Sequence, residues 1–194
     1  MKSICVFCGG NPGARPSYGA AARRLGEFMA ERGMSLVYGG AQVGLMGVIA
    51  DAVLGGGGEV LGVIPTFLAG KEIAHQGLTE LRIVSSMHER KALMAERADA
   101  FVALPGGFGT LDELFEILTW AQLGLHQKPC GVLNVDGYFD GLLSYLDHAT
   151  AEQLIKAEHR EMLIAATDPT ELLSRMSRYQ AKAVTKWMRG AGDV

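Results

Sequence analysis

The stretch Asp99-Ala-Phe-Val-Ala-Leu-Pro-Gly-Gly-Phe-Gly-Thr-Leu-Asp-Glu113 decides the fold of this 194-residue chain. Its first part, residues 99–104, is a short apolar run typical of a buried parallel strand, and residues 111–123 are expected to form a helix. Between them, three glycines permit positive φ angles and leave main-chain N–H groups uncovered. Unpaired N–H groups and the helix dipole favour an anion at a helix start, so this turn is a candidate phosphate site.

The order strand, glycine-rich turn, helix recurs along the chain. We expect strands at residues 3–8, 34–38, 59–65, 78–84, 99–104, 128–135 and 161–166. We expect helices at residues 16–32, 45–54, 86–97, 111–123, 138–149 and 168–179. This alternation predicts an α/β fold, a Rossmann-like, doubly wound parallel sheet flanked by helices.

We expect a single catalytic domain over residues 1–180 and a polar tail over residues 181–194. Ligands bind doubly wound sheets beyond the carboxyl ends of the strands, where the turns at 9–13, 39–47 and 105–109 all lie. Residues 66–77 show no clear period and are expected to form a loop or lid at the site.

Composition narrows the range of partners. The net charge of −3 offers no general attraction for nucleic acid or an anionic membrane, which favours small ligands. No run approaches the roughly 20 apolar residues of a membrane span, and the first residues lead directly into a strand, so we expect a cytoplasmic protein. Cys5 and Cys8 should point to opposite faces of the sheet and stay buried and reduced. No cluster has metal-ligand spacing, and we expect neither a metal nor an organic cofactor.

Several common nucleotide and hydrolase motifs are missing. The first strand is followed by Cys8-Gly-Gly-Asn-Pro-Gly13 rather than GxGxxG, which disfavours a nicotinamide or flavin dinucleotide. The sequence also lacks GxxxxGK[ST], GxSxG and HExxH, the patterns of P-loop proteins, α/β hydrolases and zinc proteases.

Met87-His-Glu-Arg-Lys91 followed by Pro105–Glu113 resembles the paired motifs of the "lonely guy" (LOG) family, also described as lysine decarboxylase-like. The likeness extends to residues 119–124 and 129–138, and to the glycine turns at 38–40 and 44–47. It implies a cytokinin riboside 5′-monophosphate phosphoribohydrolase. Such a hydrolase, of EC 3.2.2 type, cleaves the N-glycosidic bond between an adenine-type base and ribose 5-phosphate.

The resemblance implies that Arg90 and Glu113 are the catalytic pair. The substrate-binding positions that it implies are Glu72, Lys91, Gly106, Gly107, Phe108, Gly109, Thr110, Leu111, Asp112 and Thr119, together with Gly39 and Gly40. The chemistry agrees, because a carboxylate near C1′ stabilises an oxocarbenium-like sugar and orients water. Arg90 either holds the 5′-phosphate or polarises the departing base.

Other interpretations remain open at this point. Thr110 and Glu113 have the spacing of a capping box, in which the glutamate only satisfies the backbone, and Arg90 and Lys91 fit a solvated helix face. A non-catalytic nucleotide carrier or a molybdenum cofactor carrier is the alternative function. Lysine decarboxylation would need a pyridoxal phosphate lysine, and no lysine here has a recognisable context for one.

The helix expected after the glycine turn at residues 105–109 also predicts that the chain associates with a second copy of itself. Its apolar residues spread around more of the helix than packing on one sheet face requires. They are Leu111, Leu114, Phe115, Ile117, Leu118, Trp120, Ala121 and Leu123. We therefore expect a homodimer built partly on this helix, with Phe115 and Ile117 at the interface.

Overall fold

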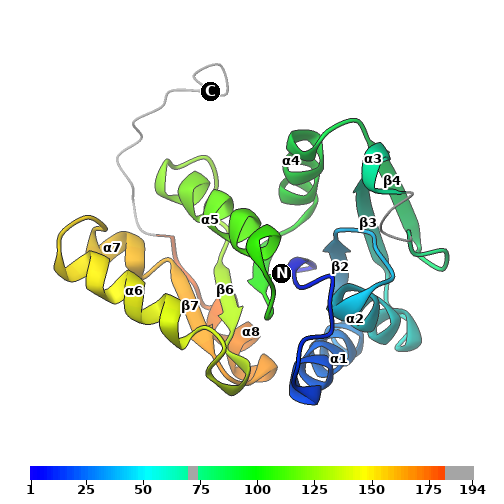
Figure 1. The fold of residues 1–194 in the computed structure, drawn as a ribbon, viewed down its shortest axis with the longest axis horizontal. Coiled ribbons are helices and arrows are strands. Elements are labelled where there is room, and N and C mark those ends of the chain that lie inside the picture. Colours follow the sequence, from blue (N-terminus) through cyan, green and yellow to red (C-terminus); the bar gives the residue numbers. More distant parts are fainter. Residues whose placement is uncertain (70–73, 182–194) are drawn as a thin grey trace.

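The structure is a computed structural model that describes residues 1–69 and 74–181 (Figure 1). Its strands form one parallel sheet in the order β4-β3-β2-β1-β5-β6-β7, which confirms the predicted doubly wound, Rossmann-like α/β fold. The strands are β1 (Ser3–Phe7), β2 (Ser35–Tyr38), β3 (Val60–Pro65), β4 (Glu80–Val84), β5 (Ala100–Ala103), β6 (Cys130–Leu133) and β7 (Leu163–Ala166). All seven lie within the predicted strand ranges.

Helices cover both faces of the sheet. The helices are α1 (Pro16–Glu31), α2 (Gly44–Gly55), α3 (Thr66–Ala69), α4 (Met87–Arg97), α5 (Phe108–Gln122), α6 (Asp140–Ala151), α7 (Ala157–Arg160) and α8 (Pro169–Ser177), with a 3₁₀ turn η1 (Val135–Gly137). Helices α1, α2 and α8 pack on one face, and α4, α5 and α6 on the other (Figure 1). Cys5 and Cys8 belong to the cores on opposite faces, as predicted.

The strand order reverses at β1, which lies between β2 and β5. The turns that follow β1 and β5 are joined there, because the Gly9 N–H donates to the Pro105 carbonyl at 3.1 Å. The start of α2 joins the same place, since the Leu45 N–H donates to the Gly9 carbonyl at 3.0 Å. Gly44 has φ +58°, and a Cβ on it would collide with the backbone of Gly10. Three glycine turns therefore meet at the switch point.

Helix α5 begins earlier than predicted. It starts at Phe108 rather than at residue 111, and its N-cap is Gly107, which makes no side-chain cap. Thr110 and Glu113 consequently lie inside the helix, and the capping-box interpretation of this pair is wrong. Because α5 starts within the glycine turn, its first uncovered N–H groups belong to the turn itself.

The exposed face of α5 is also narrower than predicted. Leu114, Ile117 and Ala121 form its core stripe, and Ile117 is only 2% exposed. Phe115 is 36% exposed on another side of the helix. The assignment of Ile117 to a subunit interface is therefore wrong, because within this chain it packs against Cys5, Phe101 and their neighbours.

Two other predictions concern the loop expected at residues 66–77 and the tail expected at residues 181–194. Residues 66–69 of the expected loop form the short helix α3, and residues 70–73 lie outside the described residues. The predicted polar tail, 181–194, lies outside them too, apart from Ala181. In the part of the chain that is described, no helix combines the length and apolarity that crossing a lipid bilayer requires.

Two glycines of α1 give a matched test of the packing between α1 and α2. A Cβ on Gly26 would meet Ala52 Cβ at 2.7 Å and the Ile49 carbonyl at 2.9 Å, whereas a Cβ on Gly19 has nothing within 4 Å. We expect Gly26→Ala to lower the free energy of unfolding by about 1–3 kcal/mol through overpacking. Gly19→Ala should raise it by about 0.5–1 kcal/mol through helix propensity. Urea denaturation measures both, and equal effects at the two positions would contradict this packing.

Candidate active site

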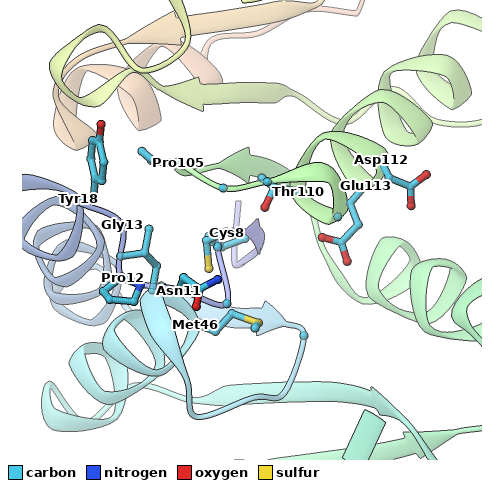
Figure 2. Close-up of a pocket in the computed structure, with 18 of the residues that line it drawn as sticks. Cys8, Asn11, Pro12, Gly13, Tyr18, Met46, Pro105, Thr110, Asp112 and Glu113 are labelled. Atoms are coloured by element: carbon cyan, nitrogen blue, oxygen red, sulfur yellow. The ribbon is translucent and has the colours of Figure 1, made fainter. Parts of the chain in front are cut away.

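A cavity of about 480 Å³ opens at the switch point of the sheet (Figure 2). One wall is the turn after β1, residues 8–13, and the facing wall is the start of α5 with the turn before it. Met46, Leu68 and Met87 contribute apolar surface, and Arg90 and Glu113 contribute charge. The cavity therefore combines an apolar region, a charged pair and a helix start, which suits a small polar ligand with an apolar part.

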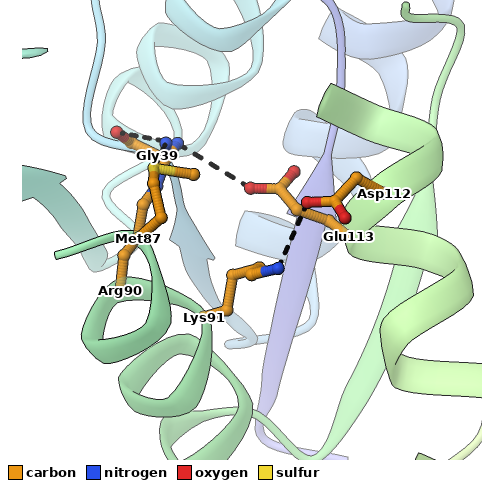
Figure 3. A network of polar contacts seen from close by, with 6 residues as sticks. All are labelled: Gly39, Met87, Arg90, Lys91, Asp112 and Glu113. Atoms are coloured by element: carbon orange, nitrogen blue, oxygen red, sulfur yellow. Dashed lines mark hydrogen bonds and ion pairs between the residues drawn. The ribbon is translucent and has the colours of Figure 1, made fainter. Parts of the chain in front are cut away.

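Arg90 and Glu113 face each other across this cavity from helices α4 and α5 (Figure 3). Arg90 Nη2 lies 3.9 Å from Glu113 Oε1, and the two side chains are only 8% and 10% exposed. This separation is too long for a hydrogen bond, so the two groups interact as neighbouring charges in a largely dehydrated place. Burial of this kind excludes the solvated helix face that the sequence also allowed for Arg90.

The guanidinium group of Arg90 is oriented by the turn after β2. Nη2 donates to the Gly39 carbonyl at 3.4 Å, and Nη1 lies 3.8 Å from Met87 Sδ (Figure 3). A Cβ on Gly39 would collide with Nη2, so glycine is required there for the guanidinium to occupy this position. The buried Arg90 Nε has no hydrogen-bond partner within the described residues. It therefore remains available to donate a hydrogen bond.

Lys91 ties the two helices that carry the pair. Its Nζ lies 3.2 Å from Asp112 Oδ2 and 3.0 Å from Glu116 Oε1, and the Lys91 side chain is 12% exposed. Partial burial by itself lowers the pKa of Lys91, but the hydrogen bonds to Glu116 and Asp112 outweigh that effect and raise it. The ammonium group therefore stays charged and bridges α4 to α5 next to Arg90.

The turn before α5 allows a ligand to approach its main chain closely. Gly106, Gly107, Gly109 and Thr110 all line the cavity. Thr110 is buried, and a Cβ on Gly106 would collide with its Oγ1. The first helical hydrogen bond after the turn runs from the Leu111 N–H to the Gly107 carbonyl at 3.1 Å. The preceding N–H groups at the helix start are thus the ones suited to an anion.

Not every residue implied by the family resemblance lines this cavity. Gly39, Gly106, Gly107, Gly109, Thr110, Asp112, Arg90 and Glu113 do. Lys91 reaches it through Asp112, and Gly40, Phe108 and Leu111 adjoin it in sequence only. Thr119 is exposed and lies instead in a second hollow beside Phe115 and Leu118. Glu72 lies outside the described residues.

Sequence reasoning did not single out two tyrosines that line the cavity. Tyr18, on the first turn of α1, packs edge-on against Tyr138, with 5.5 Å between ring centroids. The Tyr138 hydroxyl donates to the Gly106 carbonyl at 2.7 Å. The signal for Tyr138 was its place in the run 129–138 that resembles the family. Tyr18 had no such signal, because its position in the helix looks like ordinary packing.

The cysteines contribute no reactive thiol. Burial raises the pKa of Cys8, which lines the cavity, and the nearby Glu113 carboxylate raises it further. Burial raises the pKa of Cys5 in the same way and that of Cys130 to about 12. All three cysteines are free and buried. No group of His, Cys, Asp and Glu in residues 1–69 and 74–181 is arranged to hold a metal ion.

Comparison with known proteins identifies the family. The fold and site define an α/β protein with a glycine-rich turn at a helix start beside a buried Arg–Glu pair. A family model described as "Possible lysine decarboxylase" matches residues 46–176. The probable cytokinin riboside 5′-monophosphate phosphoribohydrolase LOGL9 of Oryza sativa subsp. japonica is 53% identical over 92% of this chain and 79% of its own length. LOG7 of Arabidopsis thaliana, a cytokinin riboside 5′-monophosphate phosphoribohydrolase, is 51% identical over 93% and 83%.

The chain therefore belongs to the LOG family, which that family model represents. Solved structures share the fold. The molybdenum cofactor binding protein of Rippkaea orientalis superposes with a TM-score of 0.68 at 22% identity, covering 91% of this chain and 96% of that one. The Moco carrier protein of Chlamydomonas reinhardtii gives a TM-score of 0.68 at 20% identity, covering 92% and 96%. At these identities the likeness concerns the fold alone.

We expect the thiols to be inert in the native protein, because burial excludes reagents and raises each pKa. With an aromatic disulfide reagent at pH 8, the folded protein should release less than one equivalent of thiolate within minutes. After denaturation in guanidinium it should release three, one for each cysteine. Rapid titration of one thiol before unfolding would contradict the burial of all three cysteines.

Proposed function

We propose that this chain hydrolyses the N-glycosidic bond of adenine-type nucleoside 5′-monophosphates, releasing the free base and ribose 5-phosphate. The observation that carries the proposal is the buried Arg90–Glu113 pair beside a glycine-rich helix start, in a chain about 50% identical to cytokinin riboside 5′-monophosphate phosphoribohydrolases. The substrate is a small-molecule cytokinin riboside monophosphate or a related adenine nucleotide.

The 5′-phosphate binds at the start of α5. Support comes from Gly107 and Gly109, which are exposed and line the cavity, and from the dipole of a 15-residue helix that points its positive end there. Gly39 and Lys91 lie on the side of the charged pair, because Gly39 accepts a hydrogen bond from Arg90 and Lys91 is its neighbour on α4. With the phosphate bound at the start of α5, the glycosidic bond lies between α4 and α5, next to Arg90 and Glu113.

Glu113 is the carboxylate that acts at the glycosidic carbon. It is one turn inside α5 from the phosphate turn, and it is largely buried. A carboxylate there stabilises the positive charge that develops on the sugar as the bond to the base breaks. It also orients the water whose oxygen bonds to C1′ and accepts a proton from that water.

Arg90 acts at the same end rather than at the phosphate. Its guanidinium lies between the Gly39 carbonyl and Glu113, and the partnerless Nε is buried beside them. A fixed cation there stabilises the electron pair that passes to the base nitrogen when the bond to C1′ breaks, and the base then takes up a proton that balances the one Glu113 accepts from water. This geometry favours assistance to base departure over the alternative, a clamp on the 5′-phosphate.

We expect Glu113→Gln and Arg90→Ala each to lower kcat for adenine release from AMP by about 10²-fold or more, since each removes a charge from the reacting end. Chromatographic detection of free adenine measures the rate, and circular dichroism checks the fold. Glu96→Gln is the matched control, because Glu96 is an exposed carboxylate on the helix that carries Arg90. If Glu113→Gln turned over AMP as fast as Glu96→Gln, the assignment of Glu113 would be wrong.

We also infer a homodimer that uses the outer face of α5. Phe115 is 36% exposed there and borders a hollow of about 90 Å³ with Leu118, Thr119 and Ile155. Thr119 has a substrate-contacting counterpart by family resemblance, yet it lies away from the cavity of its own chain. A two-fold partner seated on this face brings Thr119 toward the neighbouring cavity and covers Phe115.

Phe115→Glu should therefore weaken association and lower activity together, because it places a charge in an apolar contact. Ile83→Glu is the control, since Ile83 is 62% exposed on β4, an edge strand of the sheet that is not next to α5. Sedimentation velocity at sub-micromolar concentration, run beside the AMP assay, measures both effects. A wild-type protein that sediments as a fully active monomer would rule the dimer out.

A further inference from the structure

Tyr138 connects the loop after β6 to the phosphate turn. Its hydroxyl donates to the Gly106 carbonyl at 2.7 Å, across 32 residues of sequence. The side chain lines the cavity, but Tyr138 is 42% exposed and is not one of the buried residues of the hydrophobic core. A tyrosine at such a place contributes mainly through its hydroxyl and through what that hydroxyl holds.

The loop that presents Tyr138 is rigidly built. The buried Asn134 side chain accepts the Phe139 N–H at 2.7 Å and donates to Asp140 Oδ1 at 2.7 Å. Asp136 has a left-handed φ of +50° and is held by the Ser17 hydroxyl. Because both ends of the loop are anchored, the Tyr138 ring is oriented before any ligand arrives.

The hydrogen bond at Gly106 determines where the next N–H points. The peptide between Gly106 and Gly107 is trans, so its N–H is directed opposite to its carbonyl. With the Gly106 carbonyl held by Tyr138, the Gly107 N–H points away from the tyrosine hydroxyl. The preceding carbonyl, of Pro105, is held in turn by the Gly9 N–H. Both carbonyls that would repel an anion at this turn are thus engaged by donors.

We propose that Tyr138 is a positioning residue for the phosphate site: it fixes the Gly106–Gly107 peptide so that the Gly107 N–H faces the substrate's phosphate group. The inference rests on the proposed function for the identity of the anion. Tyr138 contacts the turn that binds the phosphate, not the bond that is cleaved. Loss of the hydroxyl frees the Gly106 carbonyl to rotate toward the anion, which weakens binding of the phosphate selectively.

Tyr138→Phe tests this with the smallest possible change. Tyr145→Phe is the matched control, because Tyr145 lies on α6 and is 62% exposed. Calorimetry should show Tyr138→Phe binding ribose 5-phosphate about 3- to 10-fold more weakly than wild type, the range expected for one neutral hydrogen bond. Its affinity for adenosine, which has no phosphate, should be unchanged. In the AMP assay KM should rise by the same factor while kcat stays within about twofold.

A merely structural role gives a different pattern. If Tyr138→Phe binds ribose 5-phosphate as tightly as wild type, or loses affinity equally for ribose 5-phosphate and adenosine, the positioning role is wrong. Failure of the proposed function is separate: wild type would bind ribose 5-phosphate but release no adenine from AMP. In that case the binding comparison between Tyr138→Phe and Tyr145→Phe still decides the role of Tyr138.

Discussion

The close approach of three glycine turns at the switch point is the constraint on which the rest of the site depends. The Gly9 N–H bonds to the Pro105 carbonyl, and Gly44 lies against Gly10 with no room for a Cβ. This contact sets the start of α5 beside the end of β1 and leaves an open cavity above the sheet. Larger residues would separate the turns, and the helix start would no longer face the same space as Arg90.

The charged pair depends on a second set of contacts between helices. Arg90 reaches Glu113 because Gly39 has no side chain, and Lys91 holds α4 to α5 through Asp112 and Glu116. A buried charge pair of this kind is weak evidence for stability, since dehydration offsets most of its attraction. Its placement in a cavity wall therefore favours a chemical role.

The sequence was sufficient to predict the sheet and to select Arg90, Glu113 and the glycine turn, which line one cavity, and the reasons are local. A short apolar run that ends in Pro and Gly, such as residues 99–104, is typical of a buried strand, and Gly106, Gly107 and Gly109 favour a turn whose N–H groups are uncovered. The burial of Ile117 in the core could not be predicted, because α5 has apolar residues on several sides and no single apolar stripe marks the side that packs on the sheet. Thr110 and Glu113 looked like a cap because the start of α5 within the glycine turn has no side-chain signal. Tyr18 and Tyr138 come together only through the tertiary fold.

A crystal structure of the protein with ribose 5-phosphate bound is the most direct test of the roles assigned to α5, Glu113 and Arg90. We expect the phosphate at the N-terminus of α5, within hydrogen-bond distance of the Gly107 and Gly109 N–H groups. We expect the C1 carbon next to the Glu113 carboxylate, with Arg90 on the side from which the base departs. A phosphate bound to the Arg90 guanidinium, with the glycine turn left to solvent, would contradict these roles.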